Sequence, residues 1–183
     1  MLKITIPASE VFNPSTNEFI TVKQQTLSLE HSLVSISKWE SKWHKPFLDA
    51  SYNKTQEETI DYIRCMTITQ NVDPMAYYAL TPENLIAIKK YIDDPMTATW
   101  FGEDEKNGPK KRSRVVTSEL IYYWMVTLQI PWDCQKWHIN RLLTLIKVCN
   151  EENKPQKKKS KHEIMSRNKA LNEARKRQMN TRG

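Results

Sequence analysis

The sequence predicts an α+β protein that is mostly α: a short N-terminal β-hairpin or meander packed on a helical domain, with a basic, helix-prone C-terminal extension. Three observations predict this. Polar and apolar residues alternate near the N-terminus, the apolar period becomes helical beyond Glu30, and lysine and arginine accumulate from Lys154 onward. We therefore expect a single domain over residues 1–153 and an extension over residues 154–183.

The N-terminal segment has the composition of strands separated by turns. Apolar and polar residues alternate over residues 2–6, and β-type composition resumes over residues 19–22 and 26–29. Asparagine and proline between residues 13 and 17 supply the turn. Because so small a sheet is marginal alone, it needs a helical layer on one face.

The next helices are indicated by an apolar stripe and by capping residues. Thr55 and Glu58 have the spacing of a capping box, and Thr81 followed by Pro82 is typical of an N-cap with proline at the first helical position. Four large apolar residues share one stripe of the preceding helix: Ile36, Trp39, Trp43 and Phe47.

The second half of the domain is predicted to begin with an exposed loop over residues 100–114, which is acidic and then basic and has no apolar period. Residues 118–128 are apolar on nearly all sides, which predicts a central buried helix. Pro131 breaks that helix, and Asp133 is expected to cap the next, so that the two form a helical hairpin. One face of the second helix is apolar: Ile139, Leu142, Leu143, Ile146 and Cys149.

The charge is unevenly distributed along the chain. Residues 154–183 contain eleven lysines or arginines and two glutamates, a net charge of +9. Since the whole chain carries +7, residues 1–153 carry −2. The basic character therefore belongs to the extension, and the partners of each part must be considered separately.

No segment predicts a membrane helix or a secretory signal, so we expect a soluble protein made in the cytoplasm. The cysteines, Cys65, Cys134 and Cys149, are odd in number and widely spaced in apolar or helical surroundings. We interpret them as small hydrophobic residues in a reducing compartment.

No motif for catalysis or for a cofactor stands out. The three glycines do not cluster as a phosphate loop requires, and no nucleophile elbow is present. Cys134 and His138 have the i, i+4 spacing of two metal ligands on a helix, but no second pair completes a tetrahedral set. We therefore expect no enzyme activity, no metal and no cofactor.

The basic extension has three interpretations: a nucleic-acid arm that contacts phosphates without base specificity, an arm that docks on a protein, or a solubilising end. Its aliphatic residues Ile164, Leu171 and Met179 favour docking on protein. Among the aromatic residues, Trp100 and Trp132 lie beside loop or turn residues and are the best candidates for an exposed protein-binding patch.

Three stretches of the chain are similar to known proteins: residues 27–48 (LSLEHSLVSISKWESKWHKPFL), 117–150 (TSELIYYWMVTLQIPWDCQKWHINRLLTLIKVCN) and 166–183 (SRNKALNEARKRQMNTRG). In these stretches the chain resembles a group of small tail proteins of tailed bacteriophages, the tail assembly chaperones among them. The resemblance implies a non-enzymatic factor in the host cytoplasm that binds the tape measure protein and helps tail tube subunits polymerise around it. In many tailed phages such a chaperone also has a longer, frameshifted form.

The family's motifs bring no catalytic residues, so the candidate site residues are surface elements for binding partners. They are the apolar anchors Trp100, Phe101 and Trp132, the loop cations Arg112 and Arg114, and the extension cations Lys157, Lys158, Lys159, Arg175, Lys176 and Arg177. The alternatives are a structural tail or neck protein of the virion, and a phage protein that binds nucleic acid weakly and without sequence preference.

Overall fold

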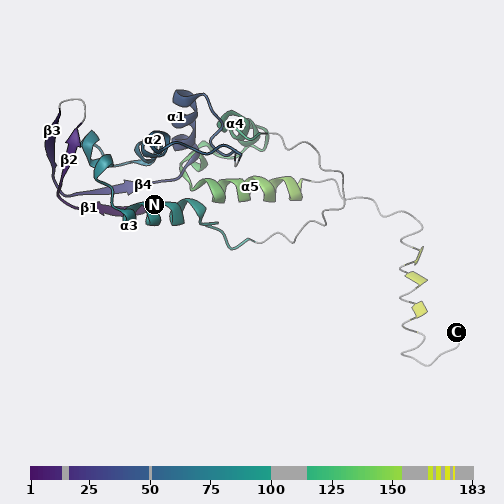
Figure 1. The fold of residues 1–183 in the computed structure, drawn as a ribbon. Helices are drawn as coiled ribbons and strands as arrows, with labels where there is room; N and C mark the ends of the chain where they lie inside the picture. The colour runs from purple at the N-terminus through teal and green to yellow at the C-terminus, as the bar shows by residue number, and fades with distance from the viewer. Residues whose placement is uncertain are drawn as a thin grey trace. The chain divides into compact units, whose positions relative to one another are not determined.

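The computed structural model describes residues 1–13, 17–49, 51–99 and 115–153, and seven helical residues further on: Met165, Ser166, Asn168, Lys169, Asn172, Glu173 and Arg175. The chain divides into two units, Met1–Cys149 and Asn150–Gly183. The protein is α+β and mostly α, as the sequence predicts (Figure 1). The fold below is that of the first unit.

The N-terminal strands form one long antiparallel hairpin that is interrupted in the middle. Its strands are β1 (Leu2–Ile6), β2 (Ser9–Asn13), β3 (Glu18–Val22) and β4 (Gln25–Leu29). β1 pairs with β4, and β2 pairs with β3. Ile6 lies opposite Gln25 and Ser9 lies opposite Val22, so the register is the same on both sides of the interruption. The predicted hairpin is thus formed, with β2 as a strand that the sequence did not predict, and Figure 1 shows it bent between its two halves.

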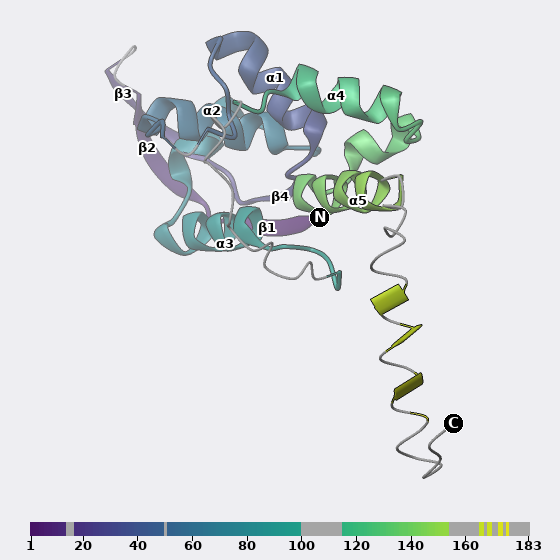
Figure 2. The ribbon, with the colours of Figure 1, turned by 90° about the vertical axis from the view of Figure 1, so that its right-hand side faces the viewer.

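Alternation along the strands puts one face of the hairpin into the core. Ile4 and Ile6 of β1 are buried, as are Leu27 and Leu29 of β4, whereas Lys3 is exposed. In both views α3 (Pro82–Asp93) lies beside β1, while α1 (Leu33–Trp43) and α2 (Gln56–Met66) lie above the β1–β4 pair (Figures 1 and 2). The small sheet therefore obtains the helical cover that it needs.

The chain that leaves α2 continues the sheet beyond β4. The backbone N–H of Glu30 donates to the carbonyl of Met66 at 2.9 Å, and that of Ile68 donates to the carbonyl of Ser28 at 2.8 Å. These bonds satisfy backbone groups on the second edge of β4. They also fix the C-terminal end of α2 against the hairpin.

The helix starts follow the capping signals. Thr55 and Glu58 form the predicted capping box of α2, and Thr81 caps α3 with Pro82 in its first turn. Ser32 and Ser35 form a further capping box at α1. Between α2 and α3 lies a 3₁₀ helix, η1 (Pro74–Ala79).

The predicted stripe of α1 is buried at Ile36 and Trp39. α1 ends at Trp43, and His44 follows in the left-handed conformation with a φ of 53°. Phe47 is nevertheless buried, because the loop after α1 folds back onto the core.

The last elements are α4 (Ser118–Thr127), the 3₁₀ helix η2 (Trp132–Lys136) and α5 (Ile139–Glu152). The expectation that Asp133 caps the last helix is wrong, because Asp133 lies inside η2 and α5 begins only at Ile139. The predicted apolar face of α5 is buried at Ile139, Leu142 and Ile146 and partly buried at Leu143 and Cys149.

Glu40, a buried residue of α1, joins distant parts of the fold. Its Oε1 atom accepts a hydrogen bond from the backbone N–H of Phe47 at 2.8 Å, and Oε2 accepts one from Ser118 at 2.7 Å. Ser118 is the first residue of α4, where a negative charge is favoured by the helix dipole. Glu40 therefore sets the position of α4 relative to α1.

The cysteines are free, with Cys134 buried and Cys65 and Cys149 half-buried. Within the described residues, no helix has the length and apolar composition that a membrane crossing requires.

We expect a chain that ends at Asn153 to unfold with the cooperativity and thermal midpoint of the full chain. The reason is that the buried positions of α5 end at Ile146, before the basic extension begins. Thermal melts followed by circular dichroism measure this. A loss of more than about 2 kcal/mol in the free energy of unfolding, the scale of a core lesion, would contradict the predicted boundary.

Candidate functional site

The exposed side of α4 and η2 carries an apolar surface, which we name the α4–η2 patch. It is formed by Tyr123, Val126 and Trp132, whose exposed fractions are 63%, 60% and 57%, together with the half-buried Tyr122. Val126 lies one helical turn beyond Tyr122 and Tyr123, and the ring of Tyr122 contacts that of Trp132. Neighbouring exposed apolar side chains of this kind are typical of surfaces that bind other proteins, which makes the patch a candidate site.

The turn between α4 and η2 positions Trp132. Gln129 adopts a left-handed conformation with a φ of 53°, and Pro131 precedes η2. The ring centroids of Tyr122 and Trp132 are 5.9 Å apart, and the Tyr122 hydroxyl donates to Oε1 of Gln135 at 3.1 Å. The predicted exposure of Trp132 is confirmed, whereas its role in binding a partner stays a prediction.

α4 is not the central buried helix that its composition predicts. Only Ser118, Ile121 and Met125 of this helix are buried. The apolar residues of the opposite face remain in contact with solvent and form the α4–η2 patch. Although α4 is apolar on nearly all sides, it therefore has one face in the core and, within the part of the chain that the structure describes, its other face exposed.

Most of the other predicted partner-binding residues lie outside the described residues: Trp100, Phe101, Arg112, Arg114, Lys157, Lys158, Lys159, Lys176 and Arg177. Arg175 is described, and it is helical and exposed. The predicted exposed loop over residues 100–114 is likewise outside the described residues.

Cys134 and His138 do not share a helical face, because Cys134 belongs to η2 and His138 precedes α5. The Nε2 atom of His138 is hydrogen-bonded to the carbonyl oxygen of Tyr91 at 2.9 Å. Among the residues that the structure describes, no group of three or more histidine, cysteine or acidic side chains could hold a metal ion.

The second candidate surface is a concave one, which we name the α2–α3 pocket, and it was not predicted from the sequence. Its volume is about 600 Å³, which is in the range of small-molecule sites. Three segments meet around it: the loop after α1, α2 and α3. The lining side chains come from Phe47, Tyr52, Asn53, Lys54, Thr59, Tyr62, Ile63, Leu85, Ile88, Lys89 and Ile92.

Two stacked rings, those of Phe47 and Tyr62, line the α2–α3 pocket, with their centroids 3.9 Å apart and an interplanar angle of 29°. The hydroxyl of Tyr62 is hydrogen-bonded to Nδ1 of His31 and lies 3.4 Å from Oγ of Ser35. Burial lowers the pKa of His31 to about 3, so this imidazole is neutral in the folded protein. The polar end of Tyr62 is thus bound within the core.

Lys54 brings a positive charge to the α2–α3 pocket. Its Nζ atom lies 4.2 Å from the centroid of the Phe47 ring and donates to the Phe47 carbonyl at 2.9 Å. Burial lowers the pKa of this half-buried lysine, although Glu58 and Asp49 act in the opposite direction. In the described part of the chain, no carboxylate oxygen lies within 4 Å of Lys54 Nζ.

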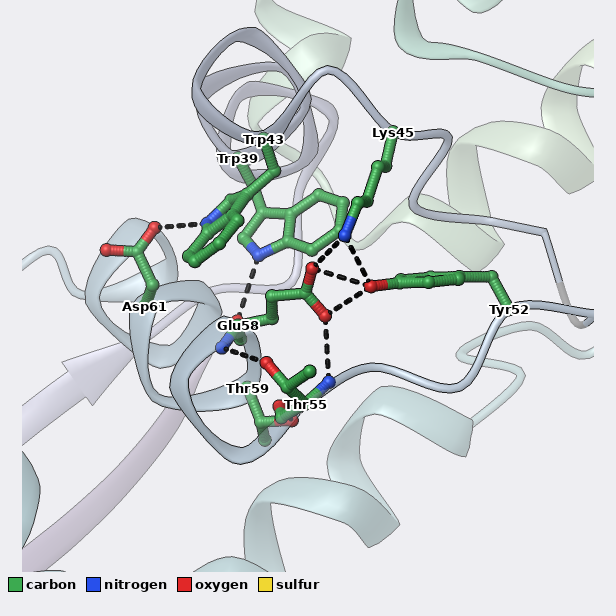
Figure 3. A network of polar contacts seen from close by, with 8 residues as sticks. All are labelled: Trp39, Trp43, Lys45, Tyr52, Thr55, Glu58, Thr59 and Asp61. Carbon is green, nitrogen blue, oxygen red and sulfur yellow. Dashed lines mark hydrogen bonds and ion pairs between the residues drawn. The ribbon is translucent and has the colours of Figure 1, made fainter.

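A polar network around Glu58 holds the loop that carries Lys54 (Figure 3). The carboxylate of Glu58, whose side chain is 1% exposed, receives Lys45 Nζ at 2.6 Å, the Tyr52 hydroxyl at 2.6 Å and the Thr55 N–H at 2.8 Å. The carbonyl of Glu58 accepts from Nε1 of Trp39 at 2.9 Å. Glu58 therefore ties the loop to α2 and to α1 at once.

The same network determines how Glu58 titrates. The hydrogen bonds from Lys45, Tyr52 and the Thr55 backbone lower the pKa of Glu58 to about 2. The bonds to Glu58 and Tyr52 raise the pKa of Lys45. Both groups are consequently charged at neutral pH, where the network is complete.

Comparison of the chain with models of known protein families, with curated proteins and with solved structures finds no match.

Glu58 is expected to make the fold sensitive to acid. Its pKa is about 2 in the folded protein against an ordinary value of 4.5, so its stabilising contribution is complete above pH 4.5 and is lost as the pH falls towards 2. We expect Glu58→Gln to lower the thermal midpoint at pH 7 and to reduce its dependence on pH between 4.5 and 2.5. Thermal melts across this range measure both effects.

Glu57→Gln is the matched control, because Glu57 is the neighbouring, exposed glutamate of α2. Because His31 is present in both variants, its contribution to the pH dependence of the thermal midpoint cancels when the two variants are compared. Equal pH profiles for Glu58→Gln and Glu57→Gln would show that the Glu58 network does not stabilise the fold.

Proposed function

We propose that the protein is a non-enzymatic tail assembly chaperone of a tailed bacteriophage. In this proposal it acts in the cytoplasm of the infected bacterial cell, binds the tape measure protein and promotes assembly of the tail tube. The observation that carries the proposal is the α4–η2 patch, which lies within residues 117–150, one of the stretches that resemble tail assembly chaperones.

The patch has the composition of a protein-binding surface. Two tyrosines and a tryptophan form most of it, and aromatic residues of this kind supply the largest share of binding energy in interfaces. Exposed polar residues, Thr127, Gln129 and Asp133, border it. An apolar stripe on a client helix could cover such a surface and would in turn be kept from aggregating.

The charge distribution favours a division of roles between the two parts of the chain. Residues 1–153 carry −2 and residues 154–183 carry +9. A cationic segment accelerates the encounter with an acidic surface, whereas apolar contacts determine how long the complex lasts. We propose that the extension guides the client and that the α4–η2 patch holds it.

Trp132→Ala is expected to weaken binding of the cognate tape measure protein by about 2 kcal/mol, because it removes an aromatic anchor at the patch. Trp100→Ala is expected to weaken it less. Since Trp132 is exposed, the thermal midpoint should not change. The measurement is a co-expression solubility assay of the tape measure protein, followed by pull-down of the complex.

Phe19→Ala provides the control, since Phe19 is an exposed aromatic residue of β3 outside the patch. If the tape measure protein is equally insoluble with and without this chain, and no complex is recovered at low salt, the proposal fails. A structural role in the tail or neck would then be the better account, and mass spectrometry of purified virions would detect the protein there.

Reversing charges of the extension, with Arg175→Glu, Lys176→Glu and Arg177→Glu together, is expected to act on the rate of association. Association should slow and its dependence on salt should flatten, while the dissociation rate changes little. Stopped-flow or biosensor kinetics at two salt concentrations measure this. An unchanged association rate would exclude the extension from the encounter.

A further inference from the structure

We propose that the α2–α3 pocket is a binding site for a small amphipathic carboxylate, a molecule with an aliphatic or aromatic body and one anionic head. Fatty acids of medium chain length and aryl carboxylates belong to this class. The inference goes beyond the chaperone function and does not depend on it, because it rests on a different surface of the molecule.

The walls of the pocket suit an apolar body. Three apolar residues of α3, Leu85, Ile88 and Ile92, face the stacked rings of Phe47 and Tyr62 across it. The hydroxyl of Tyr62 is engaged with His31 and Ser35, so Tyr62 offers the pocket its ring more than its polar end. Transfer of an aliphatic chain from water onto such walls is favourable by about 0.8 kcal/mol for each buried CH₂ group.

A smaller hollow of about 240 Å³ adjoins the pocket, because Lys54, Thr59 and Leu85 line both of them. Tyr77 and Tyr78 also line this second hollow. It provides room for a longer apolar body beside the pocket.

The positive charge of the lining residues favours a ligand with an anionic head group. Lys54 and Lys89 are the two ionisable residues other than tyrosine among the lining residues, and neither aspartate nor glutamate is present. Lys54 is half-buried over the Phe47 ring, where burial lowers its pKa, and no described carboxylate forms an ion pair with it. An anion bound beside Lys54 would form the missing ion pair. A cation would be repelled, and a neutral molecule would form no ion pair with the ammonium group.

The chain itself keeps Lys54 away from the nearest acidic groups. Glu58, which interacts with Lys54 at longer range, is engaged by Lys45, Tyr52 and Thr55. Asp49 accepts from the backbone and hydroxyl of Ser51. The Lys54 ammonium group thus retains donors for a ligand, since its one hydrogen bond within the described chain goes to the Phe47 carbonyl.

The test is a calorimetric titration of the full-length protein with decanoate, with decylammonium as the probe of reversed charge and acetate as the head group alone. We expect saturable binding of decanoate at one site and a rise in the thermal midpoint, with neither effect for decylammonium or acetate. Lys54→Met should weaken decanoate binding by about tenfold, because it removes the charge but keeps the apolar stem. Lys90→Met is the matched control, since Lys90 lies on α3 beside Lys89 but does not line the pocket.

Leu85→Trp tests the location, because Leu85 is partly exposed at the junction of the two hollows and a larger ring there should block binding. If that variant does not fold, the comparison of Lys54→Met with Lys90→Met decides alone. Equal binding of decanoate and decylammonium, absence of saturation, or decanoate affinity unchanged by Lys54→Met would each overturn the proposal. Trp132→Ala should leave decanoate binding intact, so failure of this site and failure of the chaperone function can be told apart.

Discussion

The position of both candidate surfaces depends on the buried carboxylate of Glu40. One oxygen accepts from the backbone of Phe47, whose ring lines the α2–α3 pocket, and the other accepts from Ser118 at the first turn of α4, which carries the α4–η2 patch. A buried carboxylate without such donors would be costly, so the loop and the helix must both approach Glu40 for the core to close. The arrangement is specific because two backbone N–H groups at fixed distances satisfy one side chain.

Glu58, another buried carboxylate, provides a second constraint of the same kind. As the third residue of α2 it completes the capping box with Thr55, and it also binds Lys45 and Tyr52 from the loop after α1 (Figure 3). The loop that carries Lys54 is therefore held against α2 by polar contacts as well as by the stacking of Phe47 on Tyr62. These contacts explain how a lysine can lie over the Phe47 ring with no carboxylate partner among the described residues.

The two candidate surfaces differ in the ligands that they suit. The α4–η2 patch is exposed and largely aromatic, is bordered by polar side chains, and suits an apolar stripe on another protein. The α2–α3 pocket is concave and cationic at its lining lysines, and suits a small anion with an apolar body. Because they are formed by different elements, variants at one surface can be tested without loss of the other.

Local signals in the sequence determined β1, β3 and β4 of the hairpin, the starts of α2 and α3, and the exposure of Trp132. Alternation, capping boxes and breaker residues depend on interactions between residues only a few positions apart. The sequence alone therefore contains all that is needed to predict them. Tertiary structure alone decided that α4 exposes one apolar face, that η2 replaces a cap at Asp133, and that Phe47 is buried beyond the end of α1. It also decided the α2–α3 pocket, because the bonds of Glu40 and Glu58 hold the loop with Phe47 and Lys54 in place, and α3 brings Lys89 to the same pocket. Contacts between residues so far apart in the chain leave no periodic pattern in the sequence, so they could not be predicted from it.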